Sequence, residues 1–241
     1  MIKVTKILKK GCFKLNNKIT SKINKKYCIH IENYIKGYHI NDYVFSKDKI
    51  AFVHIPKTGG TTIAEILHRE KEEKVVNLGY HRPVSLKCPP EKYKYITFIR
   101  NPIKRVWSYY CMSRRKTNNP YHDYSKRGIE VFLKNCWECR NMMSKYISGV
   151  LNEAHEDKII GKAVSNLKKI YFIGLFSSFE KSIRRLSGKL KIDIDCRIPH
   201  NRNSNKPPLK KNHQRIINHY NQLDARLYKK ILNKKNDLIG P

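Results

Sequence analysis

The sequence has few acidic residues and no long apolar stretch. It holds 19 Asp and Glu against 51 Lys and Arg in 241 residues, a formal net charge of +32 at pH 7. An excess of this size attracts polyanions such as nucleic acid, anionic lipid, an anionic glycan or a nucleotide. The apolar runs, such as 50–55 and 170–175, are far shorter than the roughly 20 residues that cross a bilayer. The sequence therefore predicts no transmembrane anchor.

Secretory and metal-binding signatures are also missing. Lysines interrupt every stretch near the N-terminus that could form the apolar centre of a signal peptide. Of the 7 Cys, only Cys136 and Cys139 form a C-x-x-C pair, and no second pair or His motif completes a zinc site. We expect free thiols, no metal, and a protein that is cytoplasmic or peripheral to a membrane through its charge.

Short apolar runs alternate with helical patterns from residue 50 onward. Runs at 50–55, 95–99 and 170–173 predict buried strands, and each is followed by apolar residues at helical spacing. This alternation predicts an α/β fold of three layers, with a central, mainly parallel sheet flanked by helices. Residues 1–48 show no sustained period, so we interpret them as a basic N-terminal extension of a domain spanning 49–241.

The first predicted strand runs into a glycine-containing loop, with the sequence HIPKTGGTT at 54–62. Gly59 and Gly60 let the backbone approach a ligand, amide groups point outward where a helix begins, and Lys57 adds a positive charge. The loop is not a Walker A motif, because its lysine precedes both glycines. It predicts an anion-binding cradle, and a plain Gly-Gly turn is the alternative.

The second predicted strand ends in RNPIKRVWSYY at 100–110. Asn101 can cap a helix whose first turn holds Pro102. Arg100 stands at the carboxyl end of the strand, and Ser108 follows about two turns into the helix. Ligands of open α/β sheets bind outside the carboxyl ends of strands, where both segments are expected. The alternative for Arg100 is a structural ion pair.

Together, and in this order, the two segments resemble the cofactor motifs of carbohydrate sulfotransferases, the group that includes heparan sulfate 2-O-sulfotransferase. Further similarity lies at 140–149, 171–180 and 223–228, so the resemblance covers about 50–232. It implies a P-loop-like fold that binds 3′-phosphoadenosine 5′-phosphosulfate (PAPS). It also implies transfer of the sulfuryl group to an acceptor hydroxyl, on a carbohydrate, without a metal.

The resemblance also implies roles for single residues. Arg100 and Ser108 match the residues that hold the 3′-phosphate. His81 lies in a segment similar to the one that carries the catalytic base, and an imidazole can take the acceptor's proton. His54 and Glu65 are alternative bases; we expect His54 to be packed or hydrogen-bonded, and Glu65 to form an ion pair or lie at the surface. Residues that match the 5′-phosphosulfate loop are Lys57, Thr58, Gly59, Gly60, Thr61 and Thr62. Lys57 is also expected to stabilise charge during transfer. Asn203 and Ser204 match a later loop that covers the cofactor.

Two other function classes stay open. A P-loop kinase would need a Walker A lysine and an acidic magnesium ligand after the second strand, where this chain has Arg100 and Asn101. A nucleic-acid-binding protein would fit the net charge, but no helix-turn-helix, zinc-finger or RNP signature is present. The acceptor is open too: a polysaccharide, a lipid-linked sugar, a small metabolite or a protein tyrosine would serve. An anionic glycan would fit basic residues within and after the second motif, namely Lys104, Arg114, Arg115 and Lys116; the alternative is that these residues are solvated helix ends.

Overall fold

The computed structural model describes residues 50–70, 75–77, 94–152, 155–191 and 206–238. The chain divides into two units, Met1–Asp42 and Tyr43–Pro241, and all the described residues belong to the second. The predicted N-terminal extension, 1–48, lies outside the described residues, so its boundary stays a prediction.

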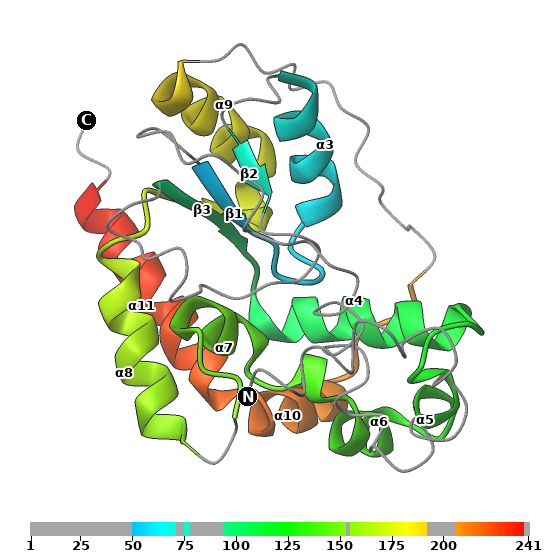
Figure 1. Ribbon diagram of the computed structural model, residues 1–241. Coiled ribbons are helices and arrows are strands. Elements are labelled where there is room, and N and C mark those ends of the chain that lie inside the picture. Colours follow the sequence, from blue (N-terminus) through cyan, green and yellow to red (C-terminus); the bar gives the residue numbers. More distant parts are fainter. Residues whose placement is uncertain (1–49, 71–74, 78–93, 153–154, 192–205, 239–241) are drawn as a thin grey trace, which may run out of the picture. The chain divides into compact units, whose positions relative to one another are not determined.

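A parallel sheet forms the centre of the second unit (Figure 1). Its described strands are β1 (Ile50–Val53), β2 (Val75–Asn77), β3 (Lys94–Ile99) and β4 (Phe172–Leu175), in the order β2-β1-β3-β4. Each neighbouring pair is parallel, and Val53 at the end of β1 stands beside Thr97 of β3. Every residue of β1 is buried. The predicted α/β class with a parallel sheet is confirmed, and β2 is a strand that the sequence patterns did not identify.

Helices α3 (Gly60–Glu70) and α9 (Phe179–Leu190) cover one face of this sheet (Figure 1). Their apolar residues join those of the strands in one core, in which the Phe98 ring lies 5.8 Å from Phe172 and 5.7 Å from Phe179 between centroids. Gly174 of β4 lies so close to Phe98 that a Cβ atom there would come within 2.3 Å of the ring. Strand β4 therefore needs glycine at that position.

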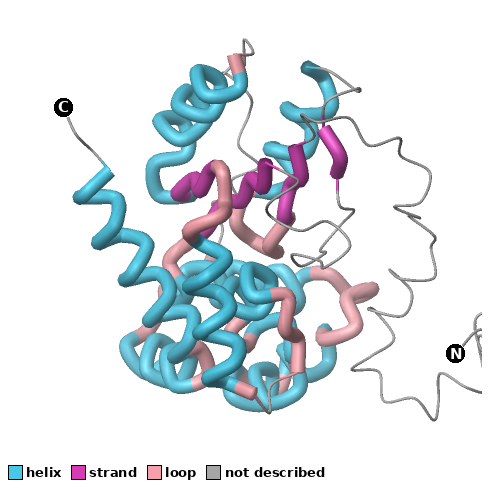
Figure 2. Tube along the Cα trace, turned by 60° about the vertical axis from the view of Figure 1, so that its left-hand side comes forward, coloured by secondary structure: helices cyan, strands magenta, loops and turns pink. Residues whose placement is uncertain are grey.

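Most other helices lie together on the opposite side of the sheet (Figures 1 and 2). They are α4 (Pro102–Arg115), α5 (His122–Lys126), α6 (Ile129–Asn135), α7 (Met142–Ser148), α8 (Glu156–Leu167), α10 (Lys211–His219) and α11 (Gln222–Leu238). Short 3-10 turns occur at Trp137–Cys139 and Phe176–Ser178. Within the described residues, no helix has the length and apolar composition needed to cross a lipid bilayer.

Helix α4 begins as its sequence predicts. The Asn101 side chain accepts a hydrogen bond from the Lys104 backbone N–H at 3.1 Å, and Pro102 occupies the first turn. Helix α4 therefore starts directly after β3, with Arg100 between the two elements.

A buried polar cluster joins α4, α7 and α11. Asp224 accepts hydrogen bonds from the backbone N–H groups of Met143 (3.1 Å) and Ser144 (2.7 Å) at the start of α7. Arg105 Nε lies 4.0 Å from the same carboxylate, and both side chains are fully buried. Arg105 Nη1 also donates to the Glu138 carbonyl oxygen at 3.2 Å. These bonds connect α4 to the segments at 140–149 and 223–228, and they hold the helix that carries Ser108.

Candidate active site

The loop after β1 has an unusual backbone. Lys57 and Gly59 adopt positive φ angles of 69° and 89°. The Thr58 hydroxyl donates to the Ile55 carbonyl oxygen at 2.8 Å, so this buried side chain shapes the loop from within. The Gly59 carbonyl oxygen accepts from the Ile63 N–H at 3.2 Å, which starts α3 at the next residue. The loop therefore turns directly from the sheet into a helix.

The two glycines of the loop are needed for different reasons. Gly59 has a positive φ, and a Cβ atom there would lie 2.9 Å from the Phe176 ring. At Gly60 a Cβ atom would lie 1.9 Å from the ring of His54. His54 is buried and stacks on Phe52 at 5.6 Å. His54 is thus packed, as predicted.

Helix α3 presents its first turn beside this loop. Thr61 is exposed and Thr62 is half-buried. The first N–H groups of an α-helix have no acceptor within the helix, and they carry its partial positive charge. Glu65, one turn further on, is exposed, as predicted. The start of α3 therefore offers backbone donors and two hydroxyl groups to an anion.

The two predicted motifs meet at the carboxyl ends of β1 and β3. Arg100 Nη1 donates to the Lys57 carbonyl oxygen at 3.1 Å, although the residues are 43 positions apart. The Arg100 guanidinium carbon lies over the Phe176 ring, 4.3 Å from its centroid, within the range of a cation–π contact. The structure therefore joins Lys57 and Arg100 as the motifs predict.

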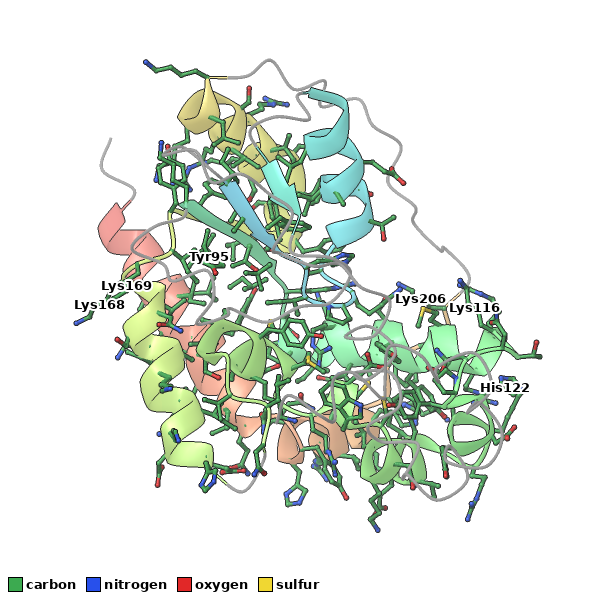
Figure 3. The ribbon with its side chains drawn as sticks, viewed as in Figure 1. Tyr95, Lys116, His122, Lys168, Lys169 and Lys206 are labelled. Atoms are coloured by element: carbon green, nitrogen blue, oxygen red, sulfur yellow. The ribbon has the colours of Figure 1, made fainter. Side chains whose placement is uncertain are left out.

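Helix α4 brings further groups to the same place. Lys57 Nζ lies 3.5 Å from Met112 Sδ, and Lys206 Nζ donates to the Ser108 hydroxyl at 3.4 Å. Ser108 and Met112 are four residues apart, so both face one side of α4. Figure 3 shows Lys206 and Lys116 above α4. Two ammonium groups, those of Lys206 and Lys57, thus contact one face of α4 at successive turns.

Positive charges crowd this site. The pKa of Lys57 is lowered from 10.5 to about 8, first by burial and then by the nearby cations Lys206, Arg100, Lys116 and Arg115, in that order. The pKa of Arg100 is lowered to about 10, first by burial and then by Arg105. All the charged groups that shift the pKa of Lys57 are cations, so the bound form of the site should contain an anion.

Three predicted site residues cannot be placed. His81, Asn203 and Ser204 lie outside the described residues. Their roles as base and cofactor-covering loop stay predictions. Lys206, which the sequence analysis did not identify, reaches the site from just beyond that loop. The chain is rich in lysine, so the residue type alone does not distinguish Lys206 from the others. The only distinguishing feature in the sequence is its position before Pro207-Pro208.

The described residues contain no group of three or more His, Cys, Asp and Glu side chains arranged to hold a metal ion. Three of the cysteines, Cys111, Cys136 and Cys139, are buried free thiols.

Comparison with known proteins gives one family. A model of the sulfotransferase family matches residues 42–236, which include the loop after β1, the segment after β3 and Lys206. A search of curated proteins finds no match to the chain. The narrower likeness to heparan sulfate 2-O-sulfotransferase stays a prediction.

Proposed function

Since the chain belongs to the sulfotransferase family, we propose that it transfers the sulfuryl group of PAPS to an acceptor hydroxyl on a carbohydrate. Family membership accounts for sulfuryl transfer itself, and the donor and the acceptor are the proposed part. The observation that carries the proposal is the meeting of two motifs, through the hydrogen bond from Arg100 to Lys57, at the carboxyl ends of β1 and β3.

The donor's two anionic ends suit the two ends of this site. PAPS carries a phosphosulfate at its 5′ position and a phosphate at its 3′ position. The start of α3 and Lys57 offer amide groups and an ammonium group for the first, and Arg100 and Ser108 offer a guanidinium and a hydroxyl for the second. A bound dianion would also relieve the mutual repulsion that lowers the pKa of Lys57.

In this reaction the protein would position the donor and the acceptor and would stabilise charge on the transferring group. When bound, the nucleotide supplies an activated sulfuryl group: the bond from sulfur to the 5′-phosphate oxygen breaks as the bond to the acceptor oxygen forms. Lys57 and the first amides of α3 would stabilise charge on the transferring group, a contribution of about 10²–10³ in rate for one such donor. His81 would accept the proton of the acceptor hydroxyl.

A nucleotide kinase fits these residues less well. Lys57 precedes the glycines and lies against Met112, instead of following the loop into the helix as a Walker A lysine does. The residues directly after β3 are Arg100 and Asn101, so no carboxylate stands there for magnesium.

The first experiment compares nucleotides by thermal shift and calorimetry. The probes are adenosine 3′,5′-bisphosphate (PAP), AMP, and ATP with magnesium. A ligand at 100 times its dissociation constant stabilises a fold by about 2.7 kcal/mol, so we expect a clear shift with PAP and smaller shifts with the others. Arg100→Ala should abolish the preference for PAP, and Arg184→Ala, on the exposed side of α9, should keep it. Equal shifts with all three nucleotides would overturn the proposed donor.

The acceptor needs its own experiment. Purified protein with labelled PAPS is offered polysaccharides, simple sugars, and tyrosine-containing peptides. We expect label on carbohydrate, and loss of that label in Lys57→Ala. Transfer to peptide alone would overturn the carbohydrate acceptor while leaving sulfuryl transfer intact.

A further inference from the structure

The segment at 206–207 is held against α4 by two adjacent contacts. Lys206 Nζ donates to the Ser108 hydroxyl at 3.4 Å, and Trp107 Nε1 donates to the Pro207 carbonyl oxygen at 3.1 Å. The Trp107 ring is buried and stacks on His213 of α10 at 4.8 Å. Two consecutive residues of α4 therefore fix two consecutive residues that lie about 100 positions later in the chain.

Lys206 lies among the same cations as Lys57. Burial lowers its pKa, Arg100 and Arg115 lower it further, and the Cys111 thiol acts in the opposite direction. Lys206 is in turn the foremost charged group that lowers the pKa of Lys57. An ammonium group held between other cations costs free energy, and a bound anion shared by them would offset that cost.

We propose that Lys206 binds the 3′-phosphate of the donor together with Ser108, and that it sets the preference for 3′-phosphorylated nucleotides. This inference rests on the proposed function. The Ser108 hydroxyl accepts from Lys206, which leaves its own proton to donate to a phosphate oxygen. Lys57 lies one helical turn further along α4, at Met112, so it is the lysine for the 5′ end.

The test is a calorimetric comparison of PAP with AMP, which lacks the 3′-phosphate. Loss of a charge-assisted hydrogen bond predicts that Lys206→Ala weakens PAP binding roughly 10- to 100-fold and AMP binding less than about threefold. Lys210→Ala is the matched control, because Lys210 is an exposed lysine of the same segment. It should bind both nucleotides as the wild type does.

Two results would overturn the inference. One is unchanged PAP binding in Lys206→Ala; the other is an equal loss for PAP and AMP, which would assign Lys206 to the 5′ end. Lys206→Arg keeps the charge and should retain most of the PAP affinity, so it separates a lost contact from a folding defect. Wild-type protein without preference for PAP over AMP would instead overturn the proposed donor, so the two failures are distinguishable.

Discussion

At the scale of single residues, the charge of Lys57 links stability to pH. Its pKa in the folded state is about 8, against an ordinary 10.5, because the group is buried among cations. Below pH 8 both states carry the proton, and the folded state bears the full cost of the buried charge. Between pH 8 and 10.5 the unfolded state binds more protons, so stability should rise with pH in this window.

The variant Lys57→Met should therefore be more stable than the wild type below pH 8, by roughly 1–2 kcal/mol after screening by solvent. The difference should shrink between pH 8 and 10.5 as the wild-type lysine loses its proton. Urea unfolding at pH 6, 7, 9 and 10 measures it, with Lys104→Met on the exposed side of α4 as control. A constant difference across that range would show that the charge of Lys57 is not the cause.

Residue types and spacing predicted part of the site. The chain order placed Lys57 and Arg100 at strand ends, and parallel strands bring such ends together, so their contact followed from topology. The contacts of Lys57 with Met112 and of Ser108 with Lys206 span 55 and 98 positions. Such contacts depend on how helices pack, and no local pattern encodes them.

At the scale of elements, burial decides which ion pair matters. The exposed pair Glu130–Lys134 is close, at 2.9 Å, whereas Arg105 and Asp224 are 4.0 Å apart and fully buried. The exposed pair is one turn apart on α6 and is screened by water. Asp224 instead satisfies two backbone donors of α7 and faces a buried guanidinium, so its loss leaves an unpaired charge.

We therefore expect Asp224→Ala to lower the free energy of unfolding by roughly 3–5 kcal/mol. Glu130→Ala should leave it almost unchanged, because water screens the exposed pair with Lys134. Urea titration of both variants, followed by circular dichroism, gives the comparison. Similar small losses in the two variants would mean that the buried cluster does not hold α7 and α11 to α4.

The elements themselves were partly predictable. Strands β1, β3 and β4 were found because their runs are buried on both faces and end at loop-forming residues. Strand β2 is three residues long at the edge of the sheet, too short to show a period. The structural role of Arg105 could not be predicted from the sequence either. A basic residue in an anion-binding motif suggests a contact with the ligand, whereas the burial of Arg105 against Asp224 depends on tertiary packing.

At the scale of the whole molecule, the net charge of +32 predicts two kinds of anion binding. A nucleotide bound as proposed would meet a few fixed groups, such as Lys57, Arg100 and Ser108. A long polyanion such as DNA would meet many dispersed lysines and release many counterions. The logarithm of the affinity falls linearly with the logarithm of the salt concentration, and the slope grows with the number of phosphates contacted. Binding of a nucleotide and binding of DNA should therefore differ in this slope.

We expect DNA binding to fall by about 10³–10⁵ between 50 and 200 mM salt if six to ten phosphates are contacted. PAP binding should fall much less, because only two anionic groups are engaged. Fluorescence anisotropy with labelled DNA and calorimetry with PAP, each across this range, measure the slopes. Arg100→Ala should weaken PAP binding and leave DNA binding almost unchanged, since one of 51 basic residues is removed. DNA binding that persists at high salt and is lost in Arg100→Ala would instead make nucleic acid the ligand of this site.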